Sequence, residues 1–384
     1  MKTTAIHDKR DAAGRALDAQ ILAYIGGADF DTPIRVTEER GDSEFSRLAL
    51  DVFAYQFERN APYRRYCQRL GVEPSHASTW RDVPAVPAAS FADARLACFP
   101  PDRTALTFVS SGTGSAGARV SRHELDAAEL YEASLSSHYR AMALPAVPTL
   151  RHVFLAPPYA DEQMSSLSFM LSALHERFGT QFDGFFVRNG ELDFEGLSAA
   201  LSRSSPCIVF GTAFAFVHFA DRCRAAGKRF SLGPGSAVIE TGGFKGKSRE
   251  VARDDLYAWF EELLAVPPQN CLSEYGMCEL GSQWYDANIA DLYARRSPRR
   301  HIKVGPHWTR TTIVDPVTAL PVAPGETGLL QIFDLCNRGS VCAVLTGDLA
   351  RERDGGIEIL GRHPGAPPKG CSIAADAMLG GAGA

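Results

Sequence analysis

The stretch CIVFGTAFAFVHFADRCRAAGKRFSLGPGSAVIETGG, residues 207–243, contains a strand, a helix and a second strand in succession. Residues 207–211 form a short apolar run that is typical of a buried strand, and residues 213–226 favour a helix. Residues 237–240 form another strand, which Thr241-Gly242-Gly243 closes. This alternation predicts an α/β fold with largely parallel strands. Ligands in such sheets bind at the carboxyl ends of the strands, where the Gly-Gly turn falls.

The same alternation extends through the preceding part of the chain. The expected elements are a helix from Asp42 or Ser43 to about Leu70, a strand at 106–109, a helix at 122–142, a strand at 151–156 and a helix at 165–178. From about Thr309 the pattern changes to short strands divided by Pro, Gly and Asn turns, at 311–314, 328–333 and 341–345. These strands predict a small β-rich subdomain over about 309–361.

The composition excludes several classes of protein. The chain has 384 residues, of which 45% are hydrophobic and 22% charged, and its formal net charge is -5. A nucleic-acid binder would carry a basic run, and a membrane protein would need about 20 consecutive apolar residues. Neither is present, and the charged N-terminus does not resemble a signal peptide, so the sequence favours a cytoplasmic protein. The nine cysteines form no CxxC pair, which disfavours a zinc site or a disulfide framework.

The loop SSGTGSAG, residues 110–117, follows the predicted strand at 106–109 and is expected to connect it to a helix. Glycine allows successive backbone N–H groups to point into one concavity, and Ser and Thr hydroxyls add neutral donors that suit a polyphosphate. The loop lacks the Gly-Lys-Ser/Thr of a P-loop and the GxGxxG of a dinucleotide fold. The residues alone therefore leave two interpretations, a phosphate-binding loop or a flexible polar turn.

Two later segments offer carboxylates beside glycines. In LSEYGMCEL, residues 272–280, Glu279 has the chemistry of a Mg²⁺ ligand and Tyr275 could stack on a nucleobase. The alternative is that Glu279 begins a helix and interacts with the helix dipole. In Thr346-Gly347-Asp348, a carboxylate at a strand end could accept hydrogen bonds from both ribose hydroxyls, or the three residues could form an ordinary turn.

In this order, the three segments resemble the phosphate loop, the YGxTE segment and the ribose-binding Asp of the adenylate-forming superfamily of acyl-CoA synthetases. A closer resemblance is to the acyl-protein synthetase (LuxE) family, through VPAVPAASF, SSLSFM, GTAFAF, TGGFKGKSRE, EYGMCELGSQWYD and KGCSI. The resemblance implies an adenylate-forming core that uses ATP and Mg²⁺. It covers about residues 45–371.

The resemblance also implies site residues. The phosphates would be wrapped by Ser110, Ser111, Gly112, Thr113, Gly114 and Ser115, with Thr113 among the catalytic residues. Gly242, Gly243, Tyr275 and Gly276 would border the adenine, Asp348 and Arg362 would contact the ribose, and Glu279 would hold Mg²⁺. Lys245 and Lys247 are weaker candidates for anion contacts.

The implied reaction has two steps. A carboxylate attacks the α-phosphate of ATP and releases pyrophosphate, and a thiol then takes the acyl group. In acyl-protein synthetases a cysteine near the C-terminus accepts that group before it passes to a reductase, and Cys371 in HPGAPPKGCSI occupies such a position. Lys369 nearby would favour its thiolate.

Three departures qualify the resemblance. The phosphate loop reads GTGS where relatives usually have a second Thr, and Cys278 replaces the Thr of YGMTE. The chain is also expected to consist of a core at 1–361 and a short flexible tail at 362–384, without the mobile C-terminal domain of acyl-CoA ligases.

Two alternatives therefore remain open. One is a stand-alone acyl or aryl ligase that loads CoA or a carrier protein. The other is a non-catalytic subunit that keeps the fold and scaffolds a multi-enzyme complex.

Overall fold

The computed structural model describes residues 8–26, 42–110, 120–147, 149–180, 184–242 and 251–364. The chain folds into two compact units. Unit 1 consists mainly of Tyr139–Gly276 and Trp284–Lys303, and unit 2 of Ala5–His138, Met277–Gln283 and Val304–Ala384. The chain thus leaves unit 1 after Gly276 and returns to it at Trp284.

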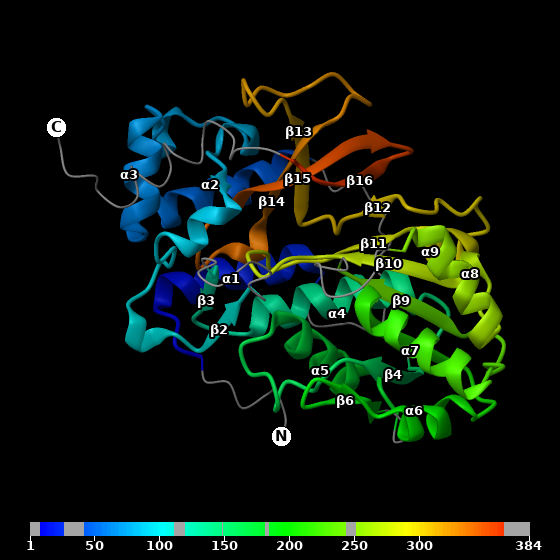
Figure 1. Ribbon diagram of the computed structural model, residues 1–384. Helices are drawn as coiled ribbons and strands as arrows, with labels where there is room; N and C mark the ends of the chain where they lie inside the picture. The colour runs from blue at the N-terminus through cyan, green and yellow to red at the C-terminus, as the bar shows by residue number, and fades with distance from the viewer. Residues whose placement is uncertain are drawn as a thin grey trace. The chain divides into compact units, whose positions relative to one another are not determined.

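Unit 1 is built on a mostly parallel sheet with the strand order β5-β4-β8-β9-β10-β11 (Figure 1). The pairs from β5 to β10 are parallel, and β11 joins β10 antiparallel. The strands are β4 (Arg151–Leu155), β5 (Gly184–Phe185), β8 (Cys207–Thr212), β9 (Ala237–Thr241), β10 (Cys271–Tyr275) and β11 (Trp284–Asp286). Between β5 and β8 in the chain, β6 (Val187–Arg188) and β7 (Glu191–Leu192) form a separate short hairpin. The predicted α/β fold with largely parallel strands is confirmed.

Helices cover both faces of this sheet. One face packs on α6 (Phe194–Leu201), α7 (Ala213–Ala226) and α8 (Arg253–Leu264) through alternate strand residues such as Val153, Val209 and Val238. On the other face Tyr139, from α4 (Glu129–Ala143), stacks on Phe210, and α5 (Ser166–Phe178) also contributes, with Phe178 lying against Tyr139. Burial on both faces explains why the strands read as continuous apolar runs.

Local signals explain the helix limits in unit 1. The Thr212 hydroxyl accepts a hydrogen bond from the Ala215 N–H, and Gly227, in the left-handed conformation, caps α7 directly after its last residue. The helix predicted at 213–226 is therefore confirmed. The unit also contains α9 (Asn288–Tyr293) and the 3₁₀ turn η6 (Pro268–Asn270).

Unit 2 contains an antiparallel sheet in the order β13-β14-β15-β16, and β1 joins β15 in parallel. The strands are β1 (Val86–Pro87), β2 (Leu106–Val109), β3 (Arg122–Leu125), β13 (Thr309–Val314), β14 (Gly328–Asp334), β15 (Ala343–Arg353) and β16 (Gly356–Arg362). The 3₁₀ turns are η2 (Pro74–His76), η3 (Trp80–Asp82), η4 (Ala88–Ala92), η5 (Pro101–Arg103) and η7 (Leu335–Asn337). The short strand β12 (Lys303–Val304) contains the point where the chain passes from unit 1 to unit 2.

The helices of unit 2 correct two predictions. The helix expected from 42 to about 70 is two helices, α2 (Asp42–Arg59) and α3 (Ala61–Arg69), because the Asn60 side chain caps the second. The helix expected at 122–142 begins only at Glu129, since residues 122–125 form β3. An N-terminal helix, α1 (Ala12–Ile25), completes the unit.

The predicted β-rich subdomain at about 309–361 contains β13 to β16. Its boundary with a tail at 362–384 stays a prediction, because residues 365–384 lie outside the described part. Among the described residues, no helix is long and apolar enough to cross a membrane.

Candidate functional site

Two of the predicted nucleotide contacts lie at neighbouring strand ends of unit 1. Strand β9 ends at Thr241 and is followed by Gly242, whose φ of +67° favours glycine. Strand β10 ends at Tyr275 and is followed by Gly276. The two strands are parallel, with Glu274 opposite Thr241, so Gly242 and Tyr275 occupy the same edge of the sheet. Gly243 lies outside the described residues.

Tyr275 is held from the side by the first residue of β11. It pairs with Trp284 in the antiparallel register, and the two ring centroids lie 6.3 Å apart in an edge-to-face arrangement. Tyr275 is half-buried, so part of its side chain remains accessible. An aromatic residue with this support can present a ring face to a flat ligand.

A contact that the sequence reasoning missed links the same two strand ends. The Thr241 hydroxyl donates a hydrogen bond to the Glu274 carboxylate, and both side chains are buried. Burial raises the pKa of Glu274 to about 7, while the hydrogen bond from Thr241 acts in the opposite direction. Nothing in the residue types foretells this contact, because it depends on the pairing of strands 33 residues apart.

The opposite face of this strand pair carries a second polar cluster. The Lys303 ammonium donates to the Ser273 carbonyl at 2.8 Å and to Asp286 at 2.6 Å, and Asp286 accepts the Ser273 N–H at 3.0 Å. On β9, Glu240 pairs with Arg253 at 3.2 Å. These contacts fix the backbone of β10 immediately before Glu274.

In unit 2, Ser110 closes the base of the predicted phosphate loop. Its N–H donates to the Ser121 carbonyl, and its hydroxyl accepts the Ser121 N–H, both at 3.1 Å. Strands β2 and β3 pair antiparallel on either side, with Val109 opposite Arg122. The loop therefore joins two strands, and the expected strand-to-helix connection is wrong. Among the loop residues, Ser111, Gly112, Thr113, Gly114 and Ser115 lie outside the described part.

Glu279 lies in the segment 277–283 of unit 2. Its side chain is buried, and no described residue forms a hydrogen bond or ion pair with its carboxylate. No helix begins at this position, so the interpretation of Glu279 as a helix-start residue is wrong. A carboxylate that no cation of the described residues neutralises is suited to bind a metal ion.

The backbone of this segment is fixed on both sides of Glu279. The Asn337 amide donates to the Glu279 carbonyl at 2.8 Å. The ring Nδ1 of His123, on β3, donates to the Cys278 carbonyl at 2.8 Å. Cys278 itself is buried, like each of the other described cysteines.

Asp334 fixes Gly281 and Ser282 of the same segment. Its carboxylate accepts the Gly281 N–H at 3.0 Å and the Ser282 hydroxyl at 2.8 Å, and burial raises its pKa to about 6. Ser282 also lies 3.1 Å from the Trp308 indole N–H. These supporting residues were not predicted, because they lie far from the motif in sequence.

The two predicted ribose contacts meet in unit 2. Asp348 on β15 lies opposite Arg362 on β16, and Arg362 Nε is 3.0 Å from Asp348 Oδ1. The Asp348 side chain is 11% exposed and that of Arg362 75% exposed. The expectation that Asp348 follows the end of a strand is wrong, since β15 continues to Arg353 and Gly347, at φ +81°, sits inside the strand.

The described residues contain no group of three or more His, Cys, Asp or Glu side chains able to hold a metal ion. A metal ion at Glu279 would therefore have at most two His, Cys, Asp or Glu ligands among the described residues. That is the pattern Mg²⁺ adopts when substrate phosphates and water complete its shell. Cys371, the predicted acyl acceptor, lies outside the described residues, as do Lys245, Lys247 and Lys369.

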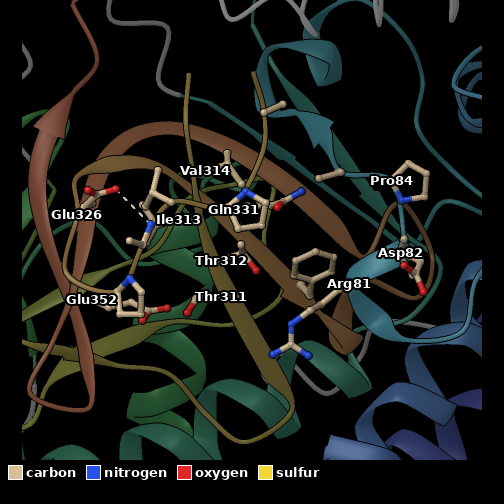
Figure 2. A pocket seen from close by; sticks show the side chains of 18 of the residues that line it. Arg81, Asp82, Pro84, Thr311, Thr312, Ile313, Val314, Glu326, Gln331 and Glu352 are labelled. Carbon is tan, nitrogen blue, oxygen red and sulfur yellow. Dashed lines mark hydrogen bonds between the residues drawn. The ribbon is translucent and has the colours of Figure 1, made fainter. Parts of the chain in front are cut away.

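Unit 2 also contains a cavity of about 410 Å³. Figure 2 shows Glu326 and Glu352 toward one end and Arg81 and Asp82 toward the other, with Gln331 between them. Its lining residues include none of the predicted site residues. Unit 1 thus carries the predicted contacts at its strand ends, and unit 2 carries the 277–283 segment, the loop base and the Asp348–Arg362 pair.

Residues 21–379 match the family described as acyl-protein synthetase, LuxE. The long-chain-fatty-acid–luciferin-component ligase of Vibrio harveyi is 23% identical, over 96% of this chain and 95% of that protein. The ligase of the same name from Aliivibrio fischeri is 22% identical, over 85% and 86%. Among solved structures, a 2-hydroxyisobutyryl-CoA ligase aligns with a TM-score of 0.62 and 17% identity, over 84% of this chain and 76% of that one, which demonstrates a shared fold.

Proposed function

This chain belongs to the acyl-protein synthetase (LuxE) family and is thus a ligase, and from that premise we propose that it activates a fatty acid with ATP and transfers the acyl group to a thiol. The observation that carries the proposal is the position of Gly242 and Tyr275 at the carboxyl ends of adjacent parallel strands. This is the edge at which ligands bind in parallel sheets. The names of the two bacterial relatives support a long-chain fatty acid as substrate.

We assign the nucleotide contacts as the resemblance implies. Ser110 to Ser115 would donate hydroxyl and amide hydrogen bonds to the phosphates, and Thr113 would contact the phosphate under attack. Gly242, Gly243, Tyr275 and Gly276 would enclose the adenine. Asp348 would accept hydrogen bonds from the ribose hydroxyls, with Arg362 beside it. Such positioning, together with neutral donors around the phosphates, is what an in-line displacement requires.

We assign Glu279 to hold Mg²⁺, which when bound would neutralise charge on the phosphates. The carboxylate oxygen of the acid would form a bond to the α-phosphorus as the bond to the bridging oxygen breaks, and pyrophosphate would leave. The hydrogen bonds from His123 to the Cys278 carbonyl and from Asn337 to the Glu279 carbonyl would keep Glu279 in place during this step.

In the second step, a thiolate would attack the acyl carbonyl and AMP would leave. We propose Cys371 as the first acceptor, followed by transfer to a partner protein. The relatives' description as ligases of a luciferin component supports a protein as the final acceptor. Transfer to CoA is the competing outcome.

The test is pyrophosphate release with ATP, Mg²⁺ and fatty acids of graded length, combined with intact mass. We expect release with a preferred acid and a hydroxylamine-labile adduct of the acyl mass. Cys371→Ser should lose the adduct and keep the first turnover, whereas Glu279→Gln should lower release on the order of a hundredfold and lose the adduct as well.

Each departure from this pattern points to a different conclusion. Release without an adduct, with acyl-CoA formed on addition of CoA, would identify a stand-alone ligase. No release with any acid and no stabilisation by ATP would identify a non-catalytic scaffold, because a bound ligand must raise the stability of the protein.

A further inference from the structure

The hydrogen bond between Thr241 and Glu274 joins the two residues that directly precede Gly242 and Tyr275. In the parallel register these two residues lie opposite one another, in the last paired row of β9 and β10. The row before it, Glu240 and Ser273, points to the other face, because successive strand residues alternate. The contact thus belongs to the very end of the strand pair.

Packing alone does not account for a carboxylate at this position. Glu274 is 5% exposed, and moving a carboxylate out of water is costly unless several hydrogen bonds compensate. Among the described residues its carboxylate accepts a hydrogen bond from Thr241 alone. A pair of apolar side chains of similar size would join the strands at lower cost.

We propose that Glu274 is a positioning residue of the nucleotide site, acting through Thr241 to hold Gly242 and Tyr275 in the spacing that adenine binding requires. This inference rests on the proposed function and extends it to two residues that the family resemblance did not identify. The reasoning is geometric: a hydrogen bond across the last paired row restricts fraying of both strand ends, and each end carries one of the two predicted contacts.

The pair also makes the site sensitive to pH. Burial raises the pKa of Glu274 to about 7, and the groups that act on its charge are Thr241, Lys303 and Glu240, with Tyr285 opposite it on β11. An ionised carboxylate accepts a stronger hydrogen bond than a neutral one. The hydrogen bond from Thr241 to Glu274 therefore becomes stronger as the pH rises through 7.

The test compares Thr241→Val, Thr241→Ser and Glu274→Gln with the wild type. Val keeps the shape of Thr but removes the donor, so we expect the KM for ATP to rise about tenfold while kcat changes less than threefold. Ser restores the donor and should recover most of the affinity. Glu274→Gln keeps an acceptor without a charge, so this variant should still bind ATP at pH 7. It should lose the roughly threefold rise in kcat/KM that we expect of the wild type between pH 6 and 8.

Glu240→Gln is the matched control. It neutralises a buried carboxylate on the same strand pair but on the opposite face. It should retain the pH step, displaced to lower pH because the charge of Glu240 raises the pKa of Glu274. The Glu274→Leu/Thr241→Val double variant should lose no more ATP affinity than Thr241→Val alone, because both substitutions break one contact.

Calorimetry measures ATP binding directly, and hydrogen exchange of residues 237–242 and 271–276 measures how far the two strand ends fray. Together these measurements test the positioning role separately from the proposed function. Faster exchange and weaker ATP binding in Thr241→Val would support the positioning role. Unchanged exchange or unchanged ATP affinity in that variant would overturn this role alone. A wild type that binds no ATP would overturn the proposed function and the positioning role together.

Discussion

At the scale of single residues, His123 shows how one buried side chain supports the segment that carries Glu279. Its Nδ1 donates to the Cys278 carbonyl at 2.8 Å, and its Nε2 lies 3.0 Å from the Ser340 hydroxyl, which fixes the neutral tautomer. Burial lowers the pKa of His123 to about 4. Between pH 6.5 and about 4, this ring is therefore uncharged in the folded protein, whereas the unfolded chain would protonate it.

Replacing His123 should weaken the fold at neutral pH and remove part of its acid sensitivity. His123→Phe keeps the ring volume but leaves the Cys278 carbonyl without its donor, a loss of about 1–3 kcal/mol in unfolding free energy at pH 7.5. The stabilisation from a neutral His123 is complete above pH 6.5 and is lost as the pH falls toward 4, because the unfolded state then binds the extra proton.

Urea unfolding at pH 7.5, 6 and 5 measures this difference. The gap between wild type and His123→Phe should shrink steadily as the pH falls, and the exposed His76→Phe variant should show no such trend. A gap that stays constant with pH would contradict the assignment of a neutral buried ring.

At the scale of elements, the cross-strand pairs of β15 and β16 offer a controlled test of nucleotide binding. Asp348 pairs with Arg362, and a few residues along the same two strands Arg351 pairs with Glu358 at 2.7 Å. Both pairs contribute to the same hairpin, but only the first was predicted to contact a ribose.

Asp348→Asn should raise the KM for ATP about tenfold or more, because a hydrogen bond to a charged acceptor is stronger than one to an amide oxygen. Glu358→Gln should leave the KM within twofold. Both variants should lose less than about 1 kcal/mol of stability, since each pair has an exposed member. Equal KM values for the two variants would show that Asp348 does not face the nucleotide.

The elements also show what the sequence can and cannot predict. The helix at 213–226 matches its predicted bounds because Thr212 and Gly227 mark its two ends, and the strand at 106–109 also matches. Residues 122–125 were assigned to a helix although His123 and Leu125 are buried and Arg122 is exposed, an alternation that marks a strand. Their pairing with β2 lies across a loop, beyond the reach of a periodicity argument.

The candidate site divides in the same way. Gly242, Tyr275, Asp348 and Arg362 were predicted from short motifs, and the strand pairing brings each pair together within its own unit. Glu274, Asp334 and Asn337 were not predicted, because their partners lie tens or hundreds of residues away. Motifs therefore predict which residues would touch a ligand, while the side chains that fix these residues are seen only in the tertiary contacts.

At the scale of the whole molecule, the YGMCE motif is shared between the two units. Tyr275 and Gly276 belong to unit 1, where Trp284 and the Lys303 cluster support them, and Met277 to Gln283 belong to unit 2, where Asp334 and Asn337 hold them. Each half of the motif is thus fixed by its own unit. A substitution that loosens one unit should affect its own half first.

Arg338 provides that test for unit 2, because it binds Asp18 and Asp126, which lie 320 and 212 residues before it in the sequence. Its guanidinium contacts Asp18 at 2.6 and 2.8 Å and Asp126 at 2.9 Å through two nitrogens, and its side chain is only 2% exposed. Removing the cation leaves two buried carboxylates without their main partner. Arg338→Leu should therefore cost about 3–5 kcal/mol in unfolding free energy.

Arg338→Lys should fall between Leu and the wild type, because an ammonium group cannot contact both carboxylates with a planar fork. Arg47→Leu, which removes an exposed pair with Asp51, should cost less than about 1 kcal/mol. Hydrogen exchange should show the loss of protection first in β13 to β15 of unit 2, while β8 and β9 of unit 1 keep theirs. Equal loss in both sets of strands would show that the two units unfold as one, and that the two halves of the motif are not supported independently.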